Sequence, residues 1–209
     1  MRNILLLIAL LFSSGMAHAG AYDEIIKAAD GNDTETVLEL LNRGMDVNTA
    51  DREGTTLLMT AARNGNIKMM KTLLASRANV NRRNQFGDSA LLMAALNGKT
   101  EAVKLLIGNK VVINTSGWAA LHYAVFGGNA EITALLIANG ADLNARAPNG
   151  QTTLMMAVKS DRFDLVQQLV TAKADMDMVD SEGRTAWQLA DQLKFKEIAD
   201  YLQVQQNAR

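Results

Sequence analysis

The chain has 209 residues, of which 48% are hydrophobic and 21% are charged, and its formal net charge is -1. This composition is typical of a globular protein with a sizeable core, and the charge gives no general attraction to nucleic acid or to an anionic membrane. Because the sequence contains no cysteine, thiol nucleophiles, zinc–thiolate sites and iron–sulfur clusters are excluded.

The first residues have the layout of a secretory signal peptide. Arg2 precedes an unbroken apolar run over residues 4–12, and Ala17-His18-Ala19 fits the small-x-small cleavage pattern. We therefore predict a signal peptide at residues 1–19 and a mature domain at 20–209, with cleavage after Ala21 as a second option. The run is shorter than the roughly 20 apolar residues that span a bilayer, so we expect no stable membrane insertion after cleavage. A buried N-terminal helix and a membrane anchor are the alternatives.

An internal repeat organises the rest of the chain. The glycines at positions 54, 87, 117, 150 and 183 are separated by steps of 33, 30, 33 and 33 residues. A pair of small residues follows seven and eight positions after each of the first four glycines, and an apolar stripe then returns at helical spacing. Each repeat therefore predicts a turn, a short helix, a second turn and a longer helix.

Six repeats follow one another along the chain, and the two terminal ones are atypical. The first has two predicted helices, 22–29 and 34–42, but no preceding hairpin. The sixth ends with a helix at 195–203 whose outer face is polar, as expected at the end of a stacked array. The predicted repeats span residues 22–48, 51–81, 84–114, 115–144, 147–177 and 180–204.

The repeats resemble those of the ankyrin family. Residues 51–81 read DREGTTLLMTAARNGNIKMMKTLLASRANVN, and the fourth repeat contains A-A-L-H-Y-A (119–124) and G-A-D-L-N (140–144). The resemblance covers about residues 22–204. It implies an all-α ankyrin-repeat solenoid of about six helix-turn-helix units with short β-hairpin fingers, and a function in protein–protein binding. With the signal peptide, it identifies the chain as similar to exported bacterial ankyrin-repeat proteins.

The departures from the family pattern fall at defined places. The threonine or serine expected to cap the first helix is replaced by Ala119 in the fourth repeat, which should cost about 1 kcal/mol. The glycine expected after the second helix is Arg77, Lys110 or Lys173 in three repeats, and each must adopt a left-handed conformation. Three residues are missing between Asn114 and Gly117, so the hairpin there must be shortened.

The chemistry-bearing residues favour structural roles. His122 matches the histidine that tightens turns in the ankyrin pattern, and no serine, aspartate or second histidine of the predicted mature chain completes a triad or a metal site. No phosphate-binding glycine loop is present. Five methionines fall at packing positions, which favours a role in the core over copper(I) binding. They are Met59, Met69, Met70, Met155 and Met156. We expect no cofactor and no bound metal.

The resemblance implies that a partner would contact the concave surface, formed by the hairpin tips and the exposed face of the first helices. Large apolar side chains gather at those positions in the two central repeats, with basic residues around them, as in a protein-binding hot spot. For Trp118, inward folding to plug the shortened hairpin is the alternative. The apolar candidates are Phe86, Leu96, Trp118, Tyr123 and Phe126. The basic candidates are Arg52, Arg63, Arg82, Arg83, Arg146 and Lys159.

The sequence thus predicts an exported, monomeric, non-enzymatic module that binds another protein and does not bind nucleic acid. The expected compartment is the periplasm, or the medium if the cell is not Gram-negative. An accessory or protective factor dedicated to one exported enzyme is the first alternative. An enzyme that uses His122 is the second.

Overall fold

A computed structural model describes residues 20–208 of the chain. Within these residues the fold is all-α, and the only β-structure is an isolated antiparallel bridge between Ala50 and Thr56. No helix in this part of the chain is both long enough and apolar enough to cross a bilayer. The predicted signal peptide, residues 1–19, lies outside the described residues.

The chain divides into two compact bodies, the first ending at Ala90 and the second beginning at Leu91. In the first body, residues 20–30 are helical and are followed by α2 (Thr34–Asn42), α3 (Leu57–Asn64) and α4 (Ile67–Ala75). The helices of the second body begin with α5, whose first residue is the last of the first body. They are α5 (Ala90–Leu96), α6 (Thr100–Gly108), α7 (Ala120–Phe126), α8 (Ala130–Ala138), α9 (Thr153–Lys159), α10 (Phe163–Thr171), α11 (Ala186–Leu193) and α12 (Lys196–Asn207).

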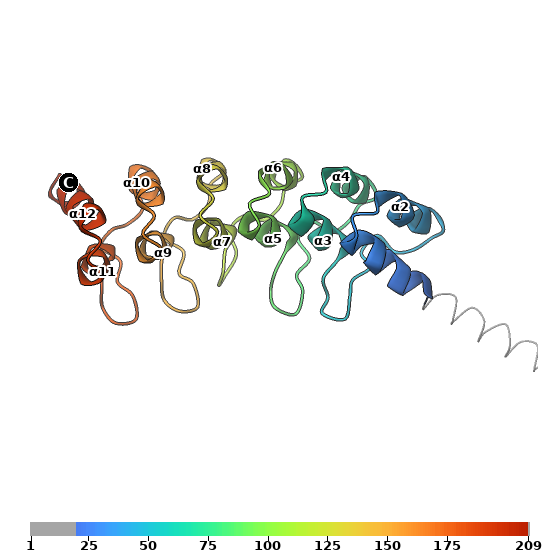
Figure 1. The fold of residues 1–209 in the computed structure, drawn as a ribbon, viewed down its shortest axis with the longest axis horizontal. Coiled ribbons are helices and arrows are strands. Elements are labelled where there is room, and N and C mark those ends of the chain that lie inside the picture. Colours follow the sequence, from blue (N-terminus) through green and yellow to red (C-terminus); the bar gives the residue numbers. More distant parts are fainter. Residues whose placement is uncertain (1–19, 209) are drawn as a thin grey trace, which may run out of the picture. The chain divides into compact units, whose positions relative to one another are not determined.

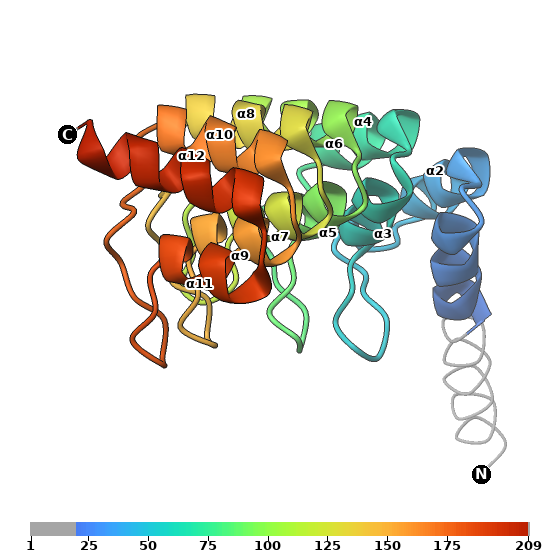
Figure 2. The ribbon, with the colours of Figure 1, turned by 60° about the vertical axis from the view of Figure 1, so that its left-hand side comes forward.

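The second body consists of helix pairs stacked side by side. Helices α7, α9 and α11 form one row and α8, α10 and α12 form the other, and each helix contacts both its partner and its counterpart in the next repeat (Figure 1). The loops that precede α9 and α11 project beyond the first row, away from the second row (Figure 2). This is the predicted repeat architecture, and α12 begins one residue after its predicted start and ends four residues after its predicted end.

Burial follows the small and branched residues of each repeat. The paired small residues of the first helices are fully buried, for example Ala61 and Ala62 in α3 and Ala157 and Val158 in α9. Small side chains at these positions allow neighbouring helices to approach closely, while the leucines and isoleucines of the second helices fill the space between repeats. The five methionines singled out in the sequence are all buried, so they are part of the core.

The ends of the helices confirm the predicted capping. The hydroxyls of Thr56, Thr152 and Thr185 each accept a hydrogen bond from the backbone N–H three residues later. Each hydroxyl satisfies an N–H group that the helix itself leaves unpaired. The predicted left-handed residues after the second helices are confirmed too. Their φ angles are 64° at Arg77, 59° at Lys110 and 71° at Lys173.

A ladder of asparagine side chains links consecutive repeats within each body. The Asn48 side-chain oxygen accepts from the backbone N–H of Asn79 at 2.8 Å in the first body. In the second body Asn114 accepts from Asp142 at 2.8 Å, and Asn144 accepts from Asp175 at 2.9 Å. Each bond spans one repeat, so it fixes the register of one loop against the next.

The fingers are tight loops framed by two backbone hydrogen bonds. In the second repeat Asp51 N–H donates to the Thr55 carbonyl and Gly54 N–H to the Asp51 carbonyl. The third, fifth and sixth repeats make the same pair of bonds. The shortened fourth finger shows neither, and its Asn114 is engaged in the ladder. The predicted shortening therefore removes the turn that elsewhere leads into the first helix.

Candidate functional site

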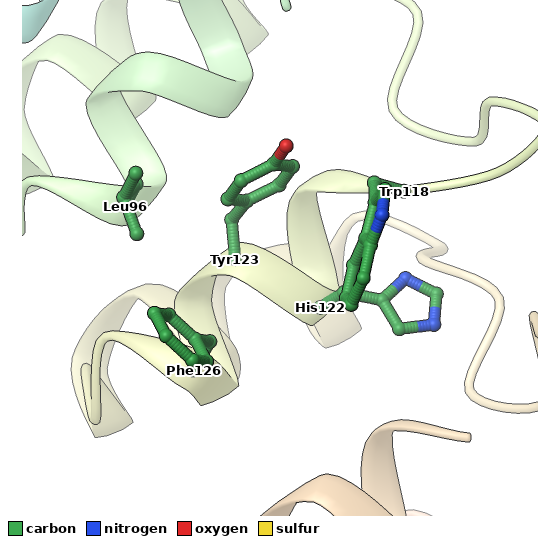
Figure 3. A pocket seen from close by; sticks show the side chains of 5 residues that line it. All are labelled: Leu96, Trp118, His122, Tyr123 and Phe126. Carbon is green, nitrogen blue, oxygen red and sulfur yellow. The ribbon is translucent and has the colours of Figure 1, made fainter. Parts of the chain in front are cut away.

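An apolar pocket of about 270 Å³ lies in the second body, next to the shortened finger. Figure 3 shows its walls: Leu96 from the end of α5, Trp118 before α7, and three residues of α7 itself. The pocket is lined by Leu96, Trp118, His122, Tyr123 and Phe126. Four of the five predicted apolar candidates are thus brought together around one cavity.

Two of the pocket residues are exposed at the ends of short helices. Phe126, the last residue of α7, has 68% of its surface exposed, and Leu96, the last residue of α5, has 38%. Corresponding positions of the second and fifth repeats carry Arg63 and Lys159, which are also exposed. The helix ends therefore place this position in solvent throughout, and only the third and fourth repeats fill it with an apolar group.

Trp118 is half-buried, and its indole ring lies between Tyr123 and His122 (Figure 3). The ring centroids of Trp118 and His122 are 5.7 Å apart with an interplanar angle of 84°, and those of Trp118 and Tyr123 are 6.0 Å apart at 54°. Both arrangements are favourable for aromatic pairs. Trp118 thus covers His122 with one part of the ring and lines the pocket with another.

His122 holds the start of α7 in place. It is fully buried, and its Nδ1 accepts a hydrogen bond from the backbone N–H of Ala119 at 3.1 Å. Its Nε2 lies 3.1 Å from the carbonyl oxygen of Ala145. Because a carbonyl only accepts, Nε2 carries the proton and the ring is neutral. Both nitrogens are therefore engaged by the backbone, as the structural interpretation of His122 expects, and neither faces a substrate.

Burial lowers the pKa of His122 below its ordinary value of 6.5. The Ala145 carbonyl and the carboxylate of Asp142 act in the opposite direction, because both favour a positively charged ring. Removal from water is the larger effect, so the neutral form is the stable one at pH 7.

The two basic candidates of the second body differ in their contacts. Arg146 donates from Nη1 to the carbonyls of Gly150 at 2.9 Å and Val179 at 2.6 Å, so it ties one finger to the next. Lys159 is exposed at the C-terminal end of α9. Arg162, which the sequence reasoning did not select, donates to the carbonyl of Gly128 at 3.0 Å and pairs with Asp164. Of these three side chains, that of Lys159 alone makes no hydrogen bond or ion pair within residues 20–208.

The remaining candidates, Phe86 and four arginines, belong to the first body. Phe86 is 67% exposed at a finger tip. The arginines are exposed as well, but three of them make contacts within that body. Arg63 forms an ion pair with Asp30 at 3.0 Å. Arg82 donates to the Asn48 carbonyl at 3.5 Å, and Arg83 donates to the Gly87 carbonyl at 3.2 Å. The fourth arginine, Arg52, is exposed to solvent.

The pocket wall formed by His122 was missed from the sequence. The residue was assigned a structural role alone, yet the helix start that it supports also places it beside Trp118. The sequence signal was the spacing: a tryptophan four residues before a histidine, at the start of a helix, lies within reach of that side chain. No group of three or more histidine, aspartate or glutamate side chains that could hold a metal ion occurs within residues 20–208.

Comparison with known proteins gives a match along nearly the whole chain. A family model described as ankyrin repeats (3 copies) matches residues 7–84, 74–147 and 128–209. The chain is 36% identical to protein phosphatase 1 regulatory subunit 27 of Mus musculus over 88 residues, which are 42% of this chain and 56% of that protein. It is 41% identical to the E3 ubiquitin-protein ligase XBAT33 of Arabidopsis thaliana over 71 residues, or 34% of this chain and 14% of that protein.

A longer match joins the chain to a larger protein. It is 28% identical to the nuclear factor NF-kappa-B p105 subunit of Gallus gallus over 170 residues, which are 80% of this chain and 14% of that protein. The chain therefore spans about half the length of the first of these relatives and a small part of the others. What they share is the repeat.

Proposed function

Because the chain belongs to the ankyrin-repeat family, whose repeats are protein–protein interaction modules, we propose that it binds a partner protein through the pocket of its second body. The partner would insert one apolar side chain between Leu96, Trp118, Tyr123 and Phe126. The observation that carries the proposal is the exposure of Phe126 and Leu96 at the mouth of an apolar cavity. A large apolar group in a partly enclosed cavity is the usual centre of a binding hot spot.

The charges near the pocket favour a carboxylate beside that apolar side chain. Lys159 occupies in the next repeat the position that Phe126 has in the fourth, and its ammonium group is exposed. An acidic residue of the partner could pair with it and set the orientation of docking. Arg146 already donates hydrogen bonds to two backbone carbonyls, so it would contribute to partner binding by holding the finger in shape.

The candidates of the first body extend the proposal to a second contact region. Phe86 presents an exposed ring on the finger of the third repeat, and Arg52 presents an exposed guanidinium on the finger of the second repeat. Arg63, Arg82 and Arg83 would keep their internal contacts on binding and supply further donors. These residues are proposed as secondary contacts because the apolar cavity described above lies in the second body.

The proposed setting is an exported bacterial protein that acts as a monomer. The support for export is the apolar run and cleavage pattern of residues 1–19, and the periplasm is the compartment expected in a Gram-negative cell. A dedicated factor for one exported enzyme is a special case of the same binding function. A catalytic role for His122 is not favoured, because the backbone engages both of its ring nitrogens.

The test is a pull-down with the mature protein from an envelope or periplasmic extract, beside three variants. Phe126→Asp should lose the bound protein, because a carboxylate in the pocket opposes an apolar side chain. Val204→Asp, at a side chain 62% exposed on α12, is the matched control and should retain it. Phe86→Asp measures the contribution of the first body. Retention of the same protein by Phe126→Asp would contradict the proposed site, and recovery of a single enzyme would identify a dedicated accessory factor.

A further inference from the structure

The fourth repeat caps its first helix with an imidazole alone. In the second, fifth and sixth repeats a threonine hydroxyl accepts the N–H of the third helical residue. Ala119 has no such group, and the side-chain link between the cap and the third residue is the bond from Ala119 N–H to His122 Nδ1. The sixth repeat makes the equivalent bond through Gln188, whose side-chain oxygen accepts from Thr185 N–H at 2.8 Å. A hydroxyl and an amide do not titrate, whereas an imidazole does.

A second proton on His122 is incompatible with this geometry. Nδ1 would become a donor and would face the Ala119 N–H, which is also a donor, at the present 3.1 Å separation. The bond would be lost, and the Ala119 side chain offers no acceptor to the first turn of α7, which keeps only the backbone bond from His122 N–H to the Ala119 carbonyl and the longer one from Tyr123 N–H. The charged ring would also be fully buried, which is unfavourable unless the ring moves toward water.

Movement of His122 would reach the pocket through Trp118. The indole lies edge-on against the imidazole and is half-buried, and the residue directly precedes Ala119 in the chain. The shortened finger that carries Trp118 also lacks the two backbone hydrogen bonds that frame the other fingers. Nothing among the described hydrogen bonds of the finger would therefore hold Trp118 in place once the ring behind it moved, apart from the Thr115 hydroxyl bond to its carbonyl at 3.4 Å.

The charged surroundings of His122 do little to prevent this. Asp142, in the segment after α8, is the one ionised group that acts on the ring, and it favours the charged form. The buried side chains of α8 and α9, both of which contact α7, carry no ionisable group. α5, which supplies Leu96 to the pocket, has no ionisable residue.

We propose that protonation of His122 dismantles the pocket, so that the protein holds an apolar side chain of its partner at neutral pH and releases it in a mildly acidic medium. The release step rests on the function proposed above, whereas the opening of the pocket does not. The sign follows from burial: the folded protein binds its proton less readily than the unfolded chain, whose histidine titrates near pH 6.5. The folded arrangement is therefore fully favoured above about pH 6.5 and loses stability as the pH falls below that value.

The first experiment follows Trp118 without any ligand. In a Trp187→Phe background, Trp118 is the only tryptophan, and its emission is recorded from about pH 7.5 to about pH 5.0. We expect a red shift with a midpoint below pH 6.5, while the helical circular dichroism stays constant. His122→Gln, which copies the amide of Gln188, should show no shift. Ala119→Thr supplies a hydroxyl acceptor and should reduce the shift. A flat Trp118 emission, an equal shift in His122→Gln, or a parallel loss of helix would overturn the proposal.

The second experiment asks whether the pocket releases a ligand. The probe is N-phenyl-1-naphthylamine, an uncharged dye that fluoresces in apolar sites. Its affinity for the wild-type protein should fall about threefold or more between pH 7.5 and pH 5.0, whereas in His122→Gln the affinity should not depend on pH. Phe126→Ser should bind the dye weakly at both pH values. If Phe126→Ser binds the dye as well as wild type, the pocket is not the binding site and the proposed function fails. The emission of Trp118 in the first experiment would still show whether the pocket opens at acidic pH.

Discussion

The indole of Trp118 lies edge-on against the imidazole of His122, with their ring centroids 5.7 Å apart. This one contact combines the two interpretations that the sequence left open for Trp118. The residue does fold inward at the shortened finger, and the rest of its ring still lines an open pocket. The defect in the repeat and the candidate binding site are therefore the same place.

Trp118→Ala should lower the free energy of unfolding by about 2 kcal/mol, because it uncovers His122 and removes the contact with Tyr123. Phe126→Ala, at a side chain 68% exposed, should change it by less than about 0.5 kcal/mol. Urea denaturation followed by circular dichroism measures both. Equal effects of the two substitutions would mean that Trp118 has no structural role.

Ala119→Thr should stabilise the protein by about 1 kcal/mol. The backbone at Ala119 has φ -92° and ψ 163°, close to the -87° and 165° of the capping Thr152, so a threonine can place its hydroxyl without rearrangement. The converse change, Thr152→Ala, should destabilise by a similar amount. The urea midpoints of the two variants give the comparison, and a loss of stability in Ala119→Thr would show that the site has no room for the larger side chain.

Lys173→Gly should stabilise the protein by up to about 1 kcal/mol, because Lys173 has a φ of 71° and glycine adopts that conformation without strain. The loss of a cation near the C-terminal end of α10 offsets part of the gain. Gly140→Lys is the reverse change at a φ of 82°, where an added Cβ meets no atom within 4 Å. It should destabilise through backbone strain alone. Thermal unfolding of both variants checks the pair, and a change of the same sign in both would exclude this explanation.

Asp180 should make the sixth repeat sensitive to strong acid. The Arg184 side chain donates to its carboxylate at 2.7 and 3.0 Å and, with two backbone N–H groups, lowers the pKa of Asp180 to about 2. Since the ordinary value is 3.8, this carboxylate stabilises the fold above about pH 4, and the stabilisation is lost as the pH falls toward 2.

Asp180→Asn is the variant that tests this. Its urea midpoint should lie below that of wild type at about pH 5 and approach it at about pH 2. Asp191→Asn, the same change at an exposed carboxylate of α11, should leave the wild-type midpoint at both pH values. A difference between Asp180→Asn and wild type that is constant with pH would mean that the ion pair is not responsible.

The repeat architecture could be predicted from the sequence because the same pattern of residues recurs in several repeats. The glycine spacing placed the fingers, and the helical periodicity predicted residues 34–42 for α2, which are its observed bounds. The left-handed Arg77, Lys110 and Lys173 followed from their alignment with Gly44 and Gly140. Each of these inferences uses averaging over copies, which removes the ambiguity of a single short segment.

The pocket could be predicted only in part, since it depends on what the copies do not share. The sequence placed Leu96, Trp118, Tyr123 and Phe126 near one another, but not the depth of a cavity or the orientation of an indole. The alignment also gave no means of seeing that Arg146 would be used to bind two carbonyls. Such details depend on side-chain rotamers and on the local path of one shortened loop, for which no second copy exists.

The asparagine ladder has a consequence for how such a chain can grow. Asn48, Asn114 and Asn144 each carry an acceptor that serves the backbone of the following repeat, and each following repeat brings its own N–H to the same position. Duplication or deletion of a 33-residue segment would therefore leave an asparagine acceptor facing a backbone N–H at each new junction between repeats. The number of repeats in such a chain can therefore change by whole repeats without loss of these bonds. The absence of three residues before Gly117 is a change of less than one repeat: the ladder bond of Asn114 is kept, whereas the two backbone bonds that frame the finger are lost.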